Sequence, residues 1–136
     1  MSVVVLIGSK HKIFKELKEL KNKRVLFITC ETSAFISNDF KFKFIFLDIS
    51  NFDTIFSKIA NYDFDVIIVE VYEIIKNYLD HKYMTRRIIE KLLIRLYSLC
   101  RAKNIEIFLV NPLNSLTKKP LIDLPNVIPL LRVRHL

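Results

Sequence analysis

The sequence predicts an α/β fold with a mostly parallel sheet and helices on both sides, a three-layer α/β/α arrangement. Short apolar, β-branched runs alternate with segments whose apolar residues recur every three or four positions, as strands and helices require. The run Val66–Val69 has no polar alternation, which is typical of a parallel strand buried on both faces. With 136 residues, 51% of them hydrophobic, the chain is long enough for one domain with one core. We therefore expect a single domain over residues 1–136.

The expected elements follow the order β-α-β-β-α-β-α-β-β. This order favours parallel strands, because a helix between two strands packs back over the sheet in a right-handed crossover. The last strand contains Pro129, which indicates an edge position or an irregular entry. The six strands are expected at Val3–Ile7, Arg24–Thr29, Phe42–Ile49, Val66–Val69, Ile105–Val110 and Val127–Val133.

Three amphipathic helices are expected between these strands. The first follows a turn at Gly8–Ser9 and carries lysines on its outer face, most simply as solvated charges. Ser50 is the expected cap of the second helix. Before the third, Tyr72–Leu79 is compatible with a helix, and the polar stretch Asp80–Thr85 predicts a break with Thr85 as the next cap. The apolar positions are Ile13, Phe14, Leu17 and Leu20, then Phe52, Ile55, Phe56 and Ile59, then Ile88, Ile89, Leu92, Leu93, Leu96, Leu99 and Cys100.

Composition narrows the classes of function. The net charge of +8 and the isoelectric point of about 9.6 describe a surface that attracts polyanions, although basic proteins without nucleic-acid partners are also common. The single glycine, against an average of about 7%, excludes most glycine-rich phosphate loops. The amino-terminal apolar run SVVVLIG is too short to cross a membrane and is followed by no cleavage-site pattern. We expect a cytoplasmic protein without a membrane partner.

No metal site or cofactor is expected. Cys30 and Cys100 are far apart, form no CxxC motif and lie in apolar patterns, so both are expected as small buried hydrophobic residues. A disulfide between them has no support in the sequence. The histidines His11, His81 and His135 have no spacing that suits a zinc site.

Polar side chains follow three of the buried strands. Glu31 follows Arg24–Thr29, Glu70 follows Val66–Val69, and Asn111 follows Ile105–Val110. Open α/β sheets bind ligands beyond the carboxyl ends of their strands. These residues are therefore the candidates for a ligand site.

The order of these segments resembles the ATPase core of the RecA superfamily, most closely archaeal RadA and its small paralogues, and also the KaiC-like proteins. VVVLIG resembles the strand before the Walker A loop, RVLFITCET the next strand, and DFDVIIVEV the Walker B strand. RRIIEKLLIRLYSLCRAKNIEIFLVNPL resembles the following helix and strand, and VIPLLRVRHL the late strands. The resemblance covers nearly the whole chain and implies a RecA-like core truncated at its amino terminus.

The resemblance also implies the remnant of a nucleotide site. Glu31 matches the catalytic glutamate of the family, Glu70 the magnesium-associated aspartate, and Asn111 the polar sensor, here followed by Pro112 in place of glutamine. The Walker A motif GxxxxGK[ST] is missing, because Gly8–Lys12 lacks the second glycine and the Lys-Ser/Thr pair. Either the three residues still converge on a ligand, or they are polar groups satisfied within the fold. Without the phosphate loop we expect the second, and hence no ATPase activity.

The resemblance implies DNA as a partner, with single strands favoured, in recombination or repair. Two loops of the family face DNA, and they correspond here to Lys76–Arg87 and Asn114–Leu124. Their cations would bind phosphates without reading sequence, and Tyr78 and Tyr83 would stack on bases. Solvated loop charges are the competing interpretation. The candidate nucleic-acid-binding residues, with two arginines of the last strand, are Lys76, Lys82, Arg86, Arg87, Lys118, Lys119, Arg132 and Arg134.

Two other functions stay open. The first is a module that pairs with an active RecA-family ATPase or regulates it. The chain begins at the first core strand, so it is expected to lack the domain that the family uses for self-assembly. It would then form one half of a homodimer or heterodimer. Exposed phenylalanines among Phe35, Phe40 and Phe42 would favour that alternative. An enzyme of other chemistry would need Glu31 and Glu70 close together as an acid–base pair.

Overall fold

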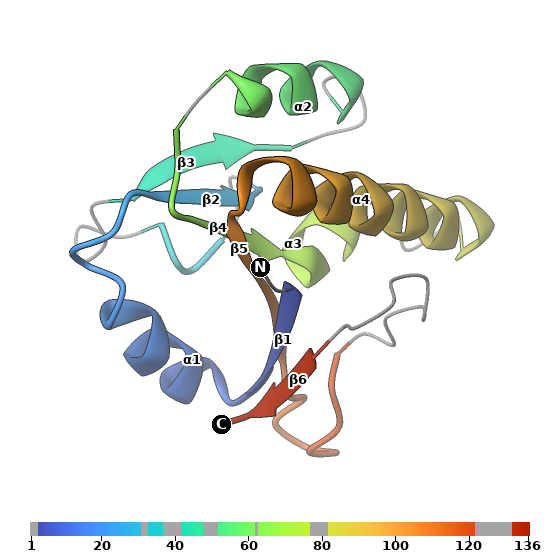
Figure 1. Ribbon diagram of the computed structural model, residues 1–136. Helices are drawn as coiled ribbons and strands as arrows, with labels where there is room; N and C mark the ends of the chain where they lie inside the picture. Colours follow the sequence, from blue (N-terminus) through green and yellow to red (C-terminus); the bar gives the residue numbers. More distant parts are fainter. Residues whose placement is uncertain are drawn as a thin grey trace.

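The computed structural model describes residues 3–30, 33–36, 42–47, 52–61, 63–76, 82–121 and 132–136. Within these residues the chain forms a six-stranded sheet in the order β3-β2-β4-β5-β1-β6, and every pair of neighbouring strands is parallel (Figure 1). The prediction of an α/β fold with a mostly parallel sheet is therefore confirmed. A RecA-like core truncated at its amino terminus stays a prediction.

The strands run close to their predicted ranges. All five residues of β2 and of β4 are buried, which fits their unbroken apolar sequences. The last strand lies at an edge, and its four residues are exposed. Residues 122–131, which include Pro129 and the predicted start of this strand, lie outside the description. The strands are β1 Val3–Gly8, β2 Val25–Thr29, β3 Lys43–Phe46, β4 Val66–Glu70, β5 Glu106–Pro112 and β6 Arg132–His135.

Helix α1, Lys10–Lys18, covers one face of the sheet. Ser9 caps it, because the Ser9 hydroxyl accepts a hydrogen bond from the Lys12 backbone N–H at 3.3 Å. Ile13 and Leu17 point inward and pack with Phe27 and other side chains of this face. The predicted amphipathic helix is therefore confirmed, and Gly8 and Ser9, predicted as a turn, are the last residue of β1 and the extended cap of α1.

The opposite face carries α2, Phe52–Ala60, α3, Val71–Ile75, and α4, Lys82–Lys103. Figure 1 shows these three helices on the other side of the sheet from α1. Their apolar residues form a second core with the alternate residues of the strands. Its helical members include Ile55, Ile59, Ile74, Leu92, Leu93 and Leu96.

The predicted break at Asp80–Thr85 is partly wrong. Helix α4 begins at Lys82, so Lys82–Thr85 are helical, and the predicted cap Thr85 lies inside the first turn. These four residues contain neither proline nor glycine, and a change from apolar to polar residues does not by itself end a helix. In the part of the chain that the structure describes, no helix combines the length and the apolarity needed to cross a membrane.

Candidate functional site

Glu70 ends the central strand β4 in a buried cluster of polar side chains. Only 2% of its surface is exposed. The Thr29 hydroxyl donates a hydrogen bond to Glu70 Oε1 at 2.7 Å, and the Ser33 hydroxyl donates to the same oxygen. Both partners come from the neighbouring β2 and the segment that follows it, because Ile28 pairs with Val69 in the sheet. We call Thr29, Ser33 and Glu70 the Glu70 cluster.

The surroundings of Glu70 disfavour its ionised form. Burial is the largest cause, and it raises the pKa of the Glu70 carboxyl above its ordinary value. The two hydroxyl donors and the positive charge of Lys10 lower the pKa and offset part of this rise, whereas the nearby charge of Glu73 raises it further. The carboxyl is therefore held in place by hydrogen bonds in surroundings that favour its neutral form over its ionised form.

The residues after Ser33 close this end of the sheet. Phe35 is fully buried, its backbone N–H donates to the Ser33 hydroxyl at 3.1 Å, and its ring stacks on Phe14 of α1 with centroids 4.1 Å apart. The connections leaving β1 and β2 run toward one edge of the sheet, and those leaving β4 and β5 run toward the other. Such a reversal is where open α/β sheets bind ligands, but here the Ser33 hydroxyl is bonded to Glu70 at the end of β4, and Phe35 packs beside Phe27 of β2.

Asn111, another predicted remnant residue, does not belong to the Glu70 cluster. It is buried at the end of β5, the next strand, but it alternates with Val110, which lies on the α1 face with Ile68. Because successive side chains of a strand point to opposite faces, Glu70 points toward the α1 face and Asn111 toward the other. Glu31 lies outside the described residues, and so does the acid–base pair with Glu70 that an enzyme of other chemistry would need.

A second buried carboxylate lies close by on α3. Glu73 is 6% exposed and forms an ion pair with Lys76, whose Nζ lies 2.7 Å from Glu73 Oε2. The Glu73 carboxylate raises the pKa of Lys76. Lys76, a predicted nucleic-acid contact, therefore already has an anionic partner within the chain.

Sequence reasoning missed the partners of Glu70, although a signal for one of them exists. Thr29 is the only polar residue of β2 and stands at its last position, as Glu70 does in β4. Within the described residues, no three His, Cys, Asp or Glu side chains are grouped so that they could hold a metal ion. Cys30 is buried, as predicted, and its thiol donates to Leu47 O at 3.4 Å, whereas the Cys100 side chain lies outside the description.

Half of the predicted basic residues, Lys118, Lys119, Arg132 and Arg134, belong to two segments that are hydrogen-bonded to the carboxyl end of β1. The Leu113 N–H donates to Gly8 O at 2.9 Å and connects the segment after β5 to this point. The Leu136 N–H donates to Ile7 O at 2.8 Å, which connects the end of β6. Figure 1 shows α1, β6 and the segment after β5 grouped at this end of the molecule.

The segment after β5 forms a closed loop that presents two lysines. The Asn114 N–H donates to Lys119 O at 2.8 Å, and the Lys118 N–H donates to Asn114 O at 3.0 Å. The Asn114 side-chain oxygen accepts from the N–H groups of Leu116 and Thr117. Lys118 has a φ of 58°, in the left-handed region that few non-glycine residues adopt. Both lysines are exposed.

The remaining predicted cations differ in their surroundings. Arg132 and Arg134 are exposed on β6, and Arg134 forms an ion pair with Glu16 of α1. Arg87 is exposed on α4. The side chains of Lys82, Tyr83 and Arg86 lie outside the description, as does all of Tyr78. The predicted loop Lys76–Arg87 is helical from Lys82 onward.

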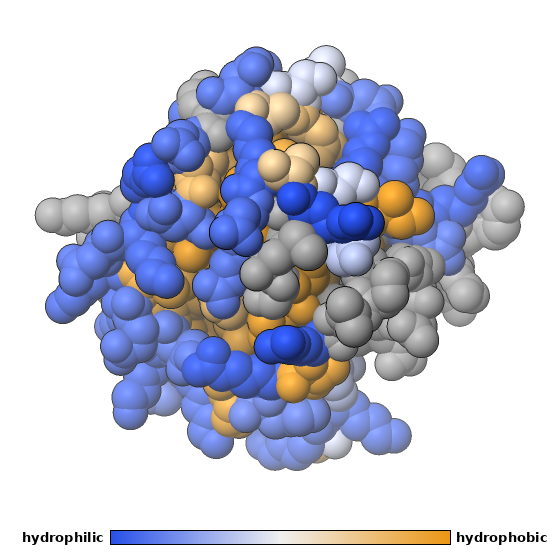
Figure 2. Space-filling model, viewed as in Figure 1, coloured by the Kyte–Doolittle hydropathy of each residue, from blue (hydrophilic) through white to orange (hydrophobic). Residues whose placement is uncertain are grey.

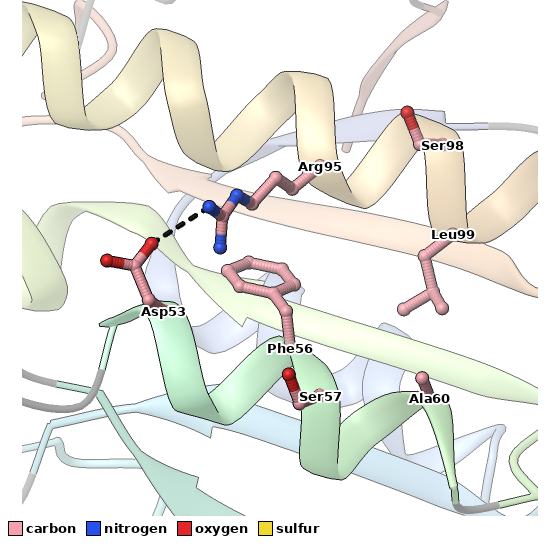
Figure 3. A pocket seen from close by; sticks show the side chains of 7 residues that line it. All are labelled: Asp53, Phe56, Ser57, Ala60, Arg95, Ser98 and Leu99. Carbon is pink, nitrogen blue, oxygen red and sulfur yellow. Dashed lines mark ion pairs between the residues drawn. The ribbon is translucent and has the colours of Figure 1, made fainter.

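An open cavity of about 460 Å³ lies between α2 and α4, on the face of the sheet away from α1 (Figure 3). Its walls are largely hydrocarbon from Phe56, Ala60 and Leu99. At one end, Arg95 Nη2 lies 2.8 Å from Asp53 Oδ1, and the guanidinium lies over the Phe56 ring. The ion pair and the ring contact join the two helices across the cavity.

No protein-family model matches the sequence, and no curated protein matches it. The resemblance to the RecA superfamily therefore rests on the order of its segments along the chain.

Proposed function

We propose that the protein is a non-catalytic, cytoplasmic RecA-fold paralogue that binds DNA, preferentially single strands, in recombination or repair. The main support is the position of four exposed cations. Two of them, Lys118 and Lys119, belong to the loop after β5, and the other two, Arg132 and Arg134, belong to β6. Backbone hydrogen bonds connect both of these segments to the end of β1. Arg87 adds a fifth exposed cation on α4.

These cations suit a phosphate backbone better than a small anion. They are spread over a loop and a strand, so they match a ligand that carries many separated negative charges. Lysine and arginine contacts to phosphates carry no sequence information and release counterions, so affinity falls as salt rises. The hydrogen bonds of Asn114 hold the lysine loop closed, which reduces the entropy lost when the loop binds.

The Glu70 cluster supports the non-catalytic part of the proposal. A magnesium-associated carboxylate is directed at its ligand, whereas the Glu70 carboxyl is 2% exposed and is held by two hydroxyl hydrogen bonds from the chain to Oε1. Phe35 fills the adjacent space. This arrangement favours a structural role for the carboxyl over metal-dependent hydrolysis.

Fluorescence anisotropy with a labelled single-stranded oligonucleotide tests the proposal. We expect binding at low salt that weakens steadily as salt is added, and a variant with K118E and K119E that binds at least about tenfold more weakly. The matched control carries K58E and R101E, two exposed cations of α2 and α4. It has the same net charge as the first variant and should bind nearly as the wild type does. Undetectable binding at low salt, or equal losses in both variants, would contradict the proposal.

The alternative is a module that pairs with a RecA-family ATPase without touching DNA. Of the phenylalanines that would support it, Phe35 is fully buried, Phe42 packs against the core, and Phe40 lies outside the description. One observation still favours it: β3 leaves an open sheet edge, and Phe46 at its end is 41% exposed. A pull-down with and without nuclease separates the two functions, because a direct protein partner survives nuclease treatment.

A further inference from the structure

We infer that α1 and β6 form a second phosphate-binding surface, which holds the backbone of a nucleic-acid duplex. This inference rests on the proposed function and extends it to α1, because Arg132 and Arg134 belong to both sets of cations. The surface is defined by Lys12, Lys15 and Lys18 of α1 and by Arg132 and Arg134 of β6, and we call it the α1–β6 surface. All five side chains belong to exposed residues.

The positive charge of the protein is concentrated on and just after α1. Residues 10–23 contain six lysines and two glutamates, a net charge of +4, which is half of the +8 of the whole chain. No ion pair joins Lys12, Lys15 or Lys18 to a carboxylate within the residues that the structure describes. Figure 2 shows hydrophilic side chains covering most of the surface over α1.

The lysines of α1 stand close together on its exposed face. Lys12, Lys15 and Lys18 are spaced three residues apart, so each is a near neighbour of the next on the helix surface, and like charges at this spacing repel. Lys15 and Lys18 lie in the last turn, where positive charge interacts favourably with the helix dipole, and the first turn contains no acidic residue. A polyanion bound along this face would relieve the repulsion between neighbouring lysines.

The row continues from α1 onto β6. Arg134 forms an ion pair with Glu16, and Lys12 lies one turn before Glu16 on the same side of the helix. The pair holds β6 against α1 and leaves the side chain of Arg134 52% exposed. Arg132, two residues earlier, points to the same side of the strand. Lys12 therefore lies beside the Arg134–Glu16 pair, and Lys15 and Lys18 continue the row of cations around the exposed side of α1.

The chemistry of the surface favours the phosphates of a duplex over other polyanionic partners. Single strands bind by stacking their bases on exposed aromatic rings, but the aromatic residue of α1, Phe14, stacks on the buried Phe35. Anionic membranes are bound by helices that insert an apolar face, but Ile13 and Leu17 of α1 are buried in the core. A rigid row of lysines without rings or free apolar groups suits a stiff, regular array of phosphates.

Binding to a labelled DNA duplex and to a labelled single strand tests this inference. A variant with K12E and K15E should lose at least about tenfold in duplex affinity, and the slope of log affinity against log salt should become shallower by about 2. Its affinity for single strands should fall by a smaller factor. The control variant with K58E and R101E has the same net charge and should keep nearly the wild-type affinity for the duplex.

Each other outcome overturns the inference. Wild-type duplex affinity in the K12E and K15E variant would show that α1 does not contact DNA, and equal losses in the control would show a nonspecific charge effect. Binding to vesicles rich in phosphatidylserine that depends on these lysines, without duplex binding, would identify a membrane partner instead. If the wild type binds single strands through Lys118 and Lys119 while its duplex binding ignores Lys12 and Lys15, only the inference fails. If the wild type binds no DNA, the proposed function fails with it.

Discussion

The Glu70 cluster and the α1–β6 surface lie on the same side of one sheet, but the ionisable groups of the first are buried and those of the second are exposed. In the cluster, a carboxyl is taken out of water and bonded to two hydroxyls of the chain. On the surface, lysines stand in a row that repels itself and has no described internal partner. The hydrogen bonds of the cluster serve the stability of the fold, whereas the exposed lysines are the groups that the proposed contact with nucleic acid uses. Function is therefore expected to follow the exposed cations.

If this contrast is correct, substitutions in and around the cluster change stability, and substitutions on the surface change binding. The largest effect is expected at Phe35, which joins the cluster to α1. Phe35→Ala should lower the free energy of unfolding by about 3 to 5 kcal/mol, because it removes a buried ring and leaves a cavity. Urea denaturation measures the loss.

The control for this change is Leu116→Ala, since Leu116 is 90% exposed and its loss should alter stability by no more than about 0.5 kcal/mol. An equally small effect of Phe35→Ala would mean that the segment after β2 does not close the sheet.

The next effect is expected at Ser33. Ser33→Ala removes one hydroxyl donor from a buried carboxyl and also the acceptor of the Phe35 N–H. The free energy of unfolding should fall by about 1 to 3 kcal/mol. Ser98→Ala is a matched control, because Ser98 is an exposed serine whose hydroxyl bonds only within α4. Similar results for both serines would argue against a structural role for the cluster.

A smaller effect, with a defined dependence on pH, is expected at Glu70. Its pKa is raised in the folded state, mainly by burial, so its contribution to stability is fully present below the unfolded value of about 4.3. That contribution is lost as pH rises through the folded value. Glu70→Gln keeps an acceptor oxygen and cannot ionise.

The stability of this variant relative to the wild type should therefore increase from mild acid to neutral pH. Urea denaturation of both proteins across this range measures the difference and cancels the titration of the other groups. A constant difference would show that Glu70 has the same pKa in the folded and unfolded states.

The smallest effect on stability is expected on the surface. Lys12→Glu places a negative charge in the first turn of α1, which is favourable for the helix dipole, but it also exchanges the attractive pair with Glu16 for a repulsive one, so the free energy of unfolding should change by no more than about 0.5 kcal/mol. The same substitution should weaken duplex binding. Thermal unfolding and anisotropy on one sample check both results, and a large loss of stability would remove the distinction between the two regions.

Much of the fold follows from local sequence patterns. The apolar run at Val66–Val69 predicts a buried central strand, and the spacing of Ile13 and Leu17 predicts α1, because these signals depend only on neighbouring residues. The order of the strands in the sheet does not follow from local patterns. Thr29 bonds Glu70 only because β2 lies next to β4, and no local pattern states which strands are neighbours. The hydrogen-bond partners of Glu70 therefore could not be predicted from single segments of the sequence.

Other details were decided by long-range contacts. Strand β5 extends two residues past its predicted end at Val110, to Pro112, because β1 continues beside it as far as Gly8. Proline has no N–H to donate, but the carbonyl of Pro112 accepts from the Leu121 N–H at 2.9 Å. Phe35 is buried although its segment has no regular structure, since it fills the space above the end of the sheet.

Gly8, the single glycine of the chain, carries no charge, but the geometry of the α1–β6 surface depends on it. A Cβ atom there would lie 2.9 Å from the Cβ of Leu136, closer than such atoms approach, so a larger residue would displace the carboxyl terminus. Arg132 and Arg134 lie just before Leu136 in the chain. A displacement of Leu136 would therefore change the distance between these arginines and the lysines of α1. The spacing between rows of positive charge, and not only their number, therefore depends on the absence of one methyl group.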